Sequence, residues 1–232
     1  MRTFLFALCA SCALAAPAAA ATRSFGITSF TRVRIEGPFK VTLATGVAPF
    51  ASARGSSAAL DRIDMEMRGD TLIVRSASSW GGNSSGNSEP VEISLGTHEL
   101  SNAWLTGAGT LAIDRVRGLS FGLSVQGSGR GEIASVQADQ MNVSLVGTAS
   151  AKLAGQTKKL TALVRGISAL DAGGLTASAA AIGADGAATV DANVAGTATV
   201  DASGPATIRL TGRPSCTLKV AASTTVSGCK NP

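Results

Sequence analysis

The sequence predicts an all-β protein: a parallel β-helix-like solenoid with coils of about 20 residues and an antiparallel strand region at its N-terminal end. The first observation behind this prediction is a Gly-centred phrase that returns at a fixed period. Its leading glycines, Gly107, Gly127, Gly147 and Gly166, are 20, 20 and 19 residues apart. Such a period is typical of solenoids, in which one coil cannot bury its apolar face without its neighbours.

Residue usage is the second observation, because it favours strand over helix. Glycine accounts for 27 of the 232 residues, and Thr, Val and Ser fill the segments between the glycines. Apolar and polar residues alternate over 120–126, which is the period of a half-buried strand. Helix is therefore a poor alternative throughout the repeating part of the chain.

The repeating part is expected to begin at 91–95 and to continue to Gly212. Beyond residue 177 a finer period of 10 residues relates 187–196 to 197–206. A coil is therefore expected to contain two halves, each a short strand followed by a turn. Glycine at a turn permits positive φ, and small residues there let coils stack at the ~4.8 Å strand spacing. The earlier coils are expected at 100–117, 119–138, 141–158 and 160–177.

The glycines of 127–132 do not form a nucleotide site. Glu132 stands where the third glycine of a dinucleotide-binding fingerprint should be, and the sequence predicts no following helix to bind phosphate. The glycines are therefore assigned to corners of the coil.

Residues 27–75 are expected to form antiparallel strands ahead of the repeats. Apolar and polar residues alternate over 30–36 and again over 39–43. Residues 64–75 have the pattern of a hairpin. For 57–67 a short helix and a further strand are both open.

Residues 76–90 are a Gly/Ser/Asn-rich loop that interrupts the strands. Nothing in it alternates, and backbone entropy opposes order in such a composition. Loops of this length are either functional or disordered. Trp80 is unusual in a passive linker, so it is a candidate ligand contact, with a purely passive residue as the alternative.

The first 21 residues have the features of a secretory signal peptide. Arg2 gives a basic start, 4–14 form an apolar run, and small residues allow cleavage after Ala20 or Ala21. The run is too short to span a membrane. The mature chain is expected to be exported to the periplasm or cell surface without a transmembrane segment. A lipid anchor at Cys12 is the alternative.

Three parts are therefore expected: a signal peptide at 1–21, an N-terminal β region at 22–90, and the Gly-x-Gly repeat solenoid at 91–232. The two mature parts are expected to form one continuous domain, which their combined length of 211 residues allows.

Two cysteines remain after processing, Cys216 and Cys229. Export to an oxidising space predicts a disulfide between them. It would close a segment of 14 residues, contribute about 3 kcal/mol under the chain-entropy model and fasten the last coil. A metal site is the alternative, but His98 is the only histidine and no histidine lies near the pair.

The distribution of charge excludes nucleic-acid binding. The formal charge of +5 falls to +4 when Arg2 leaves with the signal peptide, and basic residues are adjacent only at Lys158 and Lys159. Neither a clustered basic face nor stacking aromatics are present. No cofactor or metal site is predicted, because a metal needs at least three converging ligands. His98 is expected to be an ordinary loop residue.

Aspartates are the candidates for catalysis, because glycoside hydrolysis needs two carboxylates about 5–10 Å apart. Asp171 and Asp191 are 20 residues apart and are expected to stack on neighbouring coils, while Asp114 and Asp201 follow apolar residues in the same way. Each occupies the phase of a solvent-facing residue, so no catalytic residue is predicted. Trp104 is expected to pack in the core or against a neighbouring domain, with sugar stacking as the alternative.

Six segments of the chain carry a resemblance to a known family: 30–43, 69–74, 91–95, 105–109, 125–129 and 210–214. They appear in the same order as in the GIN family, and the chain resembles this putative autotransporter adhesin head domain of exported bacterial proteins. The resemblance implies a β-helix-like stack of parallel strands in the envelope and no agreed catalytic motif. The chain departs from the pattern where Ala149 and Ser168 replace the second glycine, which leaves the coil geometry there open.

Together these observations predict an exported envelope or cell-surface protein with a non-catalytic adhesive, scaffolding or structural role. The alternative is a carbohydrate-binding or polysaccharide-degrading β-helix protein, acting as a lyase or glycoside hydrolase. The expected partners are envelope components, glycans or other proteins. A monomer or a small homo-oligomer is expected.

Overall fold

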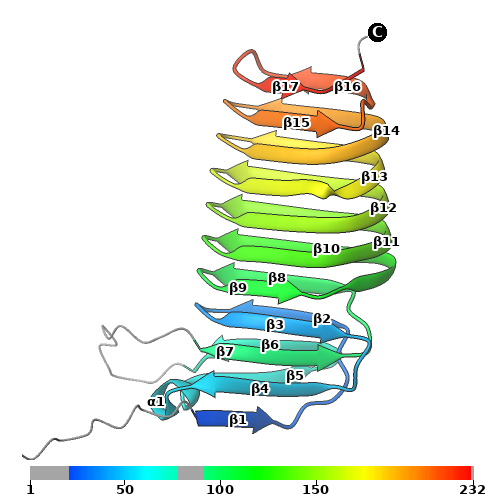
Figure 1. Ribbon diagram of the computed structural model, residues 1–232. Coiled ribbons are helices and arrows are strands. Elements are labelled where there is room, and N and C mark those ends of the chain that lie inside the picture. Colours follow the sequence, from blue (N-terminus) through cyan, green and yellow to red (C-terminus); the bar gives the residue numbers. More distant parts are fainter. Residues whose placement is uncertain (1–20, 78–90, 231–232) are drawn as a thin grey trace, which may run out of the picture.

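The computed structural model describes residues 21–77 and 91–230, which stack into a solenoid (Figure 1). Its strands belong to one continuous sheet wound into about six turns of ~20 residues. Two broad faces run along the solenoid on opposite sides of an apolar core. The predicted all-β solenoid is therefore confirmed.

The N-terminal end of the described chain contains nine strands and a single short helix. They are β1 (Ala21–Phe25), β2 (Arg32–Glu36), β3 (Lys40–Thr45), β4 (Phe50–Gly55), α1 (Ser57–Leu60), β5 (Ile63–Arg68), β6 (Thr71–Ser76), β7 (Glu92–Thr97), β8 (Asn102–Gly107) and β9 (Thr110–Ile113). The regular coils and the C-terminal end follow. They contain β10 (Val116–Gly127), β11 (Arg130–Gly147), β12 (Ser150–Gly166), β13 (Ala169–Asp185), β14 (Thr189–Ser203), β15 (Thr207–Thr211), β16 (Ser215–Val220) and β17 (Thr225–Ser227).

A regular coil has one tight corner and one open bend. In β11, residues 130–133 pair with β9 on one face, and residues 141–147 pair with β10 on the other. Between them the strand bends at a register shift after Ile133. The prediction of a turn at the end of each half-coil is wrong for these coils. β11, β12 and β13 run through the bend as single strands of 18, 17 and 17 residues, and the chain turns only at the glycine corner.

The positions of β2 and β3 in the stack differ from their positions in the chain. β2 pairs in parallel with β6 and β8, and β3 pairs in parallel with β7 and β9. Both strands therefore lie between the β6–β7 layer and the β8–β9 coil (Figure 1). These two strands therefore pair in parallel, whereas antiparallel pairing was expected for them. The turn between them is at Gly37, whose φ of 136° is positive like that of the later corner glycines.

Antiparallel pairing at the N-terminal end is confirmed for the remaining strands. β1 pairs with β4, β4 with β7, and β5 with β6. Residues 57–67 contain both structures that the sequence left open, because α1 precedes β5. α1 begins after Ser56, whose Oγ accepts a hydrogen bond of 3.3 Å from the Ala59 amide. The predicted hairpin is β5–β6, with Gly69 at φ 61° in its turn.

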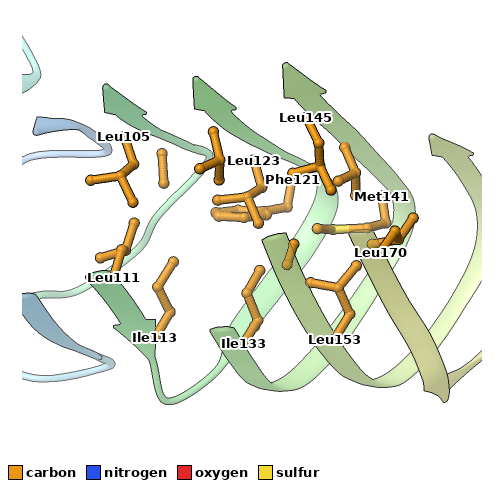
Figure 2. Close-up of a cluster of buried hydrophobic side chains, with 14 of the residues drawn as sticks. Leu105, Leu111, Ile113, Phe121, Leu123, Ile133, Met141, Leu145, Leu153 and Leu170 are labelled. Carbon is orange, nitrogen blue, oxygen red and sulfur yellow. The ribbon is translucent and has the colours of Figure 1, made fainter. Parts of the chain in front are cut away.

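The core consists of rows of apolar side chains that stack from coil to coil (Figure 2). Ile113, Ile133 and Leu153 are neighbours in register, and Phe121 lies next to Met141. All five are at most 2% exposed. Burial of each such side chain contributes about 1.5–3 kcal/mol. Because each row is completed by adjacent coils, the coils stabilise one another.

The corner glycines form a continuous row along the solenoid. Gly107, Gly127, Gly147 and Gly166 have φ between 84° and 110°. A Cβ on any of the last three would lie 2.5–2.9 Å from the carbonyl oxygen of the preceding corner glycine. Only glycine both adopts this backbone and permits this approach at low cost. The same row includes Gly37, Gly186 and Gly204, which the repeat pattern did not identify as corners.

The coil is unchanged where another residue replaces the second glycine of the repeated phrase. Ala149 and Ser168 are each 1% exposed and occupy the buried position that Gly109 and Gly129 occupy in earlier coils. The Ser168 hydroxyl donates to the carbonyl of Gly147 (3.1 Å) or to that of Arg165 (2.9 Å), so its burial leaves no unpaired polar atom. This position requires a small side chain rather than glycine.

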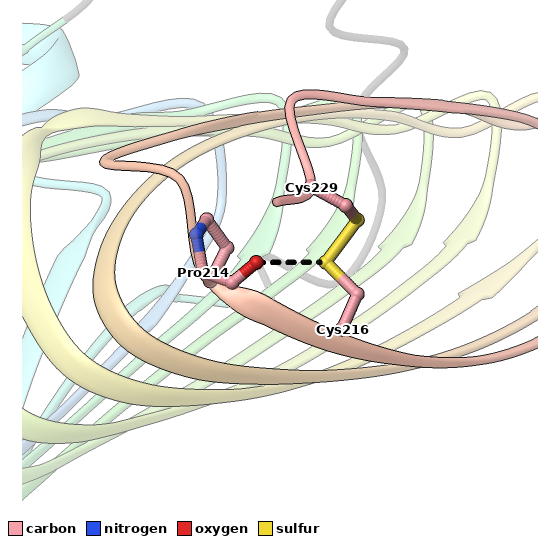
Figure 3. The surroundings of a disulfide bond; sticks show 3 residues. All are labelled: Pro214, Cys216 and Cys229. Atoms are coloured by element: carbon pink, nitrogen blue, oxygen red, sulfur yellow. Dashed lines mark hydrogen bonds between the residues drawn. A yellow bond between two sulfur atoms is a disulfide. The ribbon is translucent and has the colours of Figure 1, made fainter. Parts of the chain in front are cut away.

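The predicted disulfide between Cys216 and Cys229 is confirmed (Figure 3). Their Cα atoms are 5.7 Å apart, and Cys216 Sγ lies 3.6 Å from the Pro214 carbonyl oxygen. The Lys230 amide donates to the same carbonyl at 2.9 Å. These contacts fasten the chain after β17 to the start of β16. The disulfide thereby fixes the C-terminal end of the solenoid.

Replacing a corner glycine should destabilise the solenoid. We expect Gly147→Ala to lower the free energy of unfolding by at least about 2 kcal/mol, because alanine would be strained at this φ and its methyl group would meet a backbone carbonyl. Gly173→Ala is the matched control, since its added Cβ meets nothing closer than 3.6 Å. It should change stability by less than about 1 kcal/mol. Urea unfolding measures both, and equal effects would contradict a role of the glycine row in packing.

Removing the disulfide should loosen the C-terminal end first. We expect Cys216→Ser/Cys229→Ser to lose about 3 kcal/mol of stability, because the unfolded chain regains the entropy of the closed segment. Hydrogen exchange should rise in β15–β17 before it rises in β10–β12. A uniform rise over the whole chain would contradict a local cap.

Candidate functional site: a polar groove along the bend

A groove of about 380 Å³ runs along the open bend of β11, β12 and β13. One wall is formed by Gln137, Gln156 and Thr176, which are register neighbours on the three strands. The opposite wall is formed by Asp139, Lys158 and Ser178, two residues further along each strand. We call these six residues the bend groove.

The floor of the bend groove is the backbone of residues whose side chains point into the solenoid. Ala138 and Thr157 lie between the two walls and are 7% and 6% exposed. The Thr157 hydroxyl is 3.2 Å from both the Asp139 and the Lys159 carbonyls, so it can donate to either. The groove follows this line of inward-facing residues, because the wall residues on either side face outward.

Polar groups in the bend groove repeat at the spacing of the strands, ~4.8 Å. The amide side chains of Gln137 and Gln156 can each donate and accept hydrogen bonds. Lys158 Nζ pairs with Asp139 Oδ1 at 2.9 Å, so the charges of this wall balance. The row continues beyond the groove to Asn193, whose Nδ2 donates to Thr176 Oγ1 at 3.3 Å. The arrangement can bind a polar, extended partner through repeated hydrogen bonds.

Sequence reasoning missed the bend groove, although a signal exists. A triplet of polar, small or hydroxyl, and polar residues recurs at 137–139, 156–158 and 176–178, with spacings of 19 and 20 residues. The Gly-centred phrase repeats more strongly, and it indicates the corner of the coil rather than the bend. A search for polar residues at the same period would have found the groove.

Asp171 and Asp191 are neighbours in register, as the sequence predicted. Lys152 lies next to Asp171 on one side, and Arg209 lies next to Asp191 on the other. Arg209 Nη1 is 4.0 Å from Asp191 Oδ1, and the Asp191 side chain is 40% exposed. The two aspartates thus lie side by side on a flat sheet, between Lys152 and Arg209 in the same row.

The two tryptophans differ from expectation in different ways. Trp80 lies outside the described residues. Trp104 is partly exposed on the outer surface of β8, because its neighbours Ala103 and Leu105 take the core positions at 0% and 1% exposure. Core packing was therefore the wrong prediction for Trp104. Strand alternation overrides the hydrophobicity of the single residue.

Two further hollows lie on the N-terminal half. One of about 420 Å³ has an apolar lining that includes Leu43, Phe50 and Ile113, and Phe50 is 43% exposed. The other, of about 320 Å³, is lined by His98 together with Arg115 and other residues. His98 is exposed there, and its carbonyl accepts from the Gly46 amide at 3.0 Å.

Exposed side-chain hydrogen bonds at the N-terminal end lower the pKa values of the Glu92 and Asp70 carboxyl groups. The hydrogen bond of 2.7 Å from Lys40 lowers the pKa of Glu92, and the bond of 2.7 Å from the Thr31 hydroxyl lowers that of Asp70. The contribution of each bond to folding stability is present at pH values above the ordinary pKa of a carboxyl group. It is lost as the pH falls through the lowered pKa. Because the groups are exposed, solvent and salt screen these bonds.

Among residues 21–77 and 91–230, no three His, Cys, Asp or Glu side chains gather closely enough to hold a metal ion. Across the same described ranges, no helix is long and apolar enough to cross a membrane.

Residues 29–214 match the family model described as "Putative auto-transporter adhesin, head GIN domain", so the chain belongs to this family. The resemblance seen in the sequence is thereby confirmed. No curated protein matches the chain.

Solved structures share the fold at low sequence identity. A putative adhesin from Bacteroides fragilis NCTC 9343 has a TM-score of 0.82 and 18% identity, covering 89% of this chain and 95% of that one. A putative lipid binding protein from Parabacteroides distasonis ATCC 8503 has a TM-score of 0.73 and 16% identity, covering 90% and 96%. A putative adhesin from Parabacteroides merdae ATCC 43184 has a TM-score of 0.71 and 14% identity, covering 90% and 96%.

Substituting the stacked aspartates should leave the molecule intact. We expect Asp171→Asn and Asp191→Asn each to change the free energy of unfolding by less than about 0.5 kcal/mol, because both side chains are on the surface. The wild-type protein should leave neutral and acidic polysaccharides uncleaved in a reducing-end assay. Cleavage that the double variant abolishes would make the aspartates catalytic.

Proposed function

We propose that this chain is an exported, non-catalytic adhesion protein whose bend groove binds an extended surface or envelope polymer. Membership of a family described as adhesin head domains supports the adhesive role. The single observation that carries the site is the continuity of the groove over three successive coils.

An extended partner fits the bend groove better than a compact one. The wall residues repeat along the solenoid axis, so a polymer lying along the axis meets a similar polar group at each coil. Individual hydrogen bonds at such an exposed site contribute only about 0.5–1.5 kcal/mol each. Adhesion therefore depends on several repeats being engaged together, which a regular stack provides.

Export is supported by two independent features of the chain. The N-terminal residues have the composition of a signal peptide, with cleavage expected after Ala20 or Ala21. The disulfide of Cys216 and Cys229 is of the kind that persists in oxidising compartments. The site of action is accordingly the periplasm or the cell surface, and the protein acts as a monomer or small homo-oligomer.

A non-catalytic role is supported by the setting of the stacked aspartates. Asp171 and Asp191 are exposed and flanked by cationic neighbours, whereas a glycosidase holds its carboxylates around a bound sugar in a cleft. Scaffolding is compatible with the same groove. The proposed role of Trp80 as a ligand contact stays a prediction.

Removing the polar wall of the bend groove should weaken adhesion without unfolding the protein. We expect the triple variant Gln137→Ala/Gln156→Ala/Thr176→Ala to bind isolated envelope fractions or immobilised glycoproteins at least about tenfold more weakly than wild type. Its side chains are exposed, so its thermal unfolding should stay close to wild type. Biolayer interferometry with the mature chain measures the binding.

A matched control removes three hydroxyl groups elsewhere on the solenoid. Thr189→Ala/Thr199→Ala/Thr217→Ala alters exposed strand residues outside the bend groove and should bind like wild type. Equal losses in the two variants would reject the groove as the site. Absence of binding by the wild-type protein to every surface tested would reject the adhesive function itself.

A further inference from the structure

Charge is distributed unevenly between the bend and the rest of the regular coils. From residue 114 to residue 220, we call the part of each coil that lies between the two faces the bend side. It carries five basic residues and two acidic ones, so it is cationic. Its segments are 114–119, 134–140, 154–159, 173–178, 193–196 and 212–214. Its charged residues are Arg115, Arg117, Lys158, Lys159 and Arg213, with Asp114 and Asp139.

The two faces and the glycine corners of the same coils are balanced in charge. Between residues 114 and 220 they carry five basic and five acidic residues. The excess of positive charge in these coils therefore lies on the bend side, which also contains the bend groove. Coiling thus gathers on one side cations that are scattered along the sequence. The balanced residues are Arg130, Lys152, Arg165, Arg209 and Lys219, with Glu132, Asp171, Asp185, Asp191 and Asp201.

Both acidic residues of the bend side already have a partner. Asp114 Oδ2 pairs with Arg115 Nε at 3.3 Å, and Asp139 Oδ1 pairs with Lys158 Nζ at 2.9 Å. The remaining three cations are exposed, and no ion pair among the described residues involves them. Their charges are therefore available to an acidic partner. They are Arg117, Lys159 and Arg213.

Two of these three cations flank the bend groove. Arg117 is the register neighbour of Gln137, so it extends one wall of the groove onto β10. Lys159 comes directly after the opposite wall on β12, and its register neighbours, Gln140 and Ala179, are uncharged. A chain that lies in the groove therefore has a cation beside each wall. A concave surface lined by one sign of charge concentrates partners of the opposite sign.

Carboxylates limit this cationic stretch rather than interrupt it. Glu99 lines the hollow of about 320 Å³ together with Arg115 and Arg117, beyond the N-terminal end of the bend groove. On the adjoining face, the row from Glu132 to Arg209 contains both signs of charge. Neither feature places an unpaired carboxylate among the residues that line the groove.

The spacing of the coils favours a polysaccharide over a polypeptide. Equivalent residues on successive coils are ~4.8 Å apart along the axis. A pyranose ring with its glycosidic oxygen spans a similar distance, so an extended glycan brings successive rings to successive coils. Side chains on one side of an extended peptide are about 6.6 Å apart, so they fall out of step with the coils.

We propose that the bend side binds an acidic polysaccharide, with successive sugar rings along the bend groove and their acidic groups near Arg117 and Lys159. Sugar hydroxyls both donate and accept hydrogen bonds, as do the amide groups of Gln137 and Gln156. Single-stranded nucleic acid would need aromatic side chains on which its bases stack, and the bend side has none. The inference rests on the proposed function and deepens it by naming the class of polymer.

The test titrates the mature chain with oligogalacturonate and alginate oligosaccharides, and with cello- and manno-oligosaccharides as neutral counterparts. Calorimetry should show that at least one acidic oligosaccharide binds more tightly than the neutral ones. Its affinity should fall as the salt concentration rises, because salt screens exposed charges. We expect Arg117→Gln/Lys159→Gln to weaken this binding at least about tenfold.

A matched control removes the same charge from the corner side of the coils. Arg130 and Arg165 are exposed next to the glycine corners, and no ion pair among the described residues involves either of them. Arg130→Gln/Arg165→Gln should bind the acidic oligosaccharide like wild type. The circular dichroism spectra of both double variants should match that of the wild-type protein.

The proposal is overturned if no acidic oligosaccharide binds, if neutral oligosaccharides bind as tightly as acidic ones, or if the two double variants bind alike. Tighter binding to anionic phospholipid vesicles or to single-stranded DNA than to any acidic oligosaccharide would overturn it too. The proposed function survives each of these results if the triple variant of the bend groove still loses binding to envelope fractions. It fails separately, if the wild-type protein does not bind those fractions or if the triple variant binds them unchanged.

Discussion

The contact between successive corner glycines is the constraint on which the rest of the solenoid depends. At each corner the backbone has positive φ and lies against the backbone of the preceding corner, so one residue must meet both requirements. Because the corners are superimposed, the strands that leave them stay in register for many residues. That register aligns Ile113, Ile133 and Leu153 into one row of the core. Corner geometry and core packing therefore support each other.

The opposite side of the coil is under a weaker constraint, and this difference produces the bend groove. At the bend the strands continue without a turn and shift register, at positions that differ from one pair of strands to the next. Gly155 accommodates this shift with φ of 121° against the backbone of Val136. The polar side chains just beyond the shift line the bend groove. A regular corner thus fixes the stack, whereas the irregular bend creates its concave polar surface.

Features that repeat locally could be predicted from the sequence, whereas features that depend on distant pairing could not. Gly107, Gly127 and Gly147 repeat within one stretch, so the coil length and the corner followed from them. Gly37 belongs to the same row but lies 70 residues before Gly107, and no local pattern shows that β2 and β3 enter the stack between later strands. The outward position of Trp104 could also have been predicted from the sequence, because Ala103 and Leu105 continue the alternation of buried residues on either side.

The bend groove follows from the direction in which a β-solenoid repeats. Along the axis, register repeats similar side chains, so the bend groove suits a partner that extends over several coils. The six residues of the bend groove lie outside the apolar core. Substitutions there leave the glycine row and the buried rows in place, so the fold does not depend on which side chains line the groove.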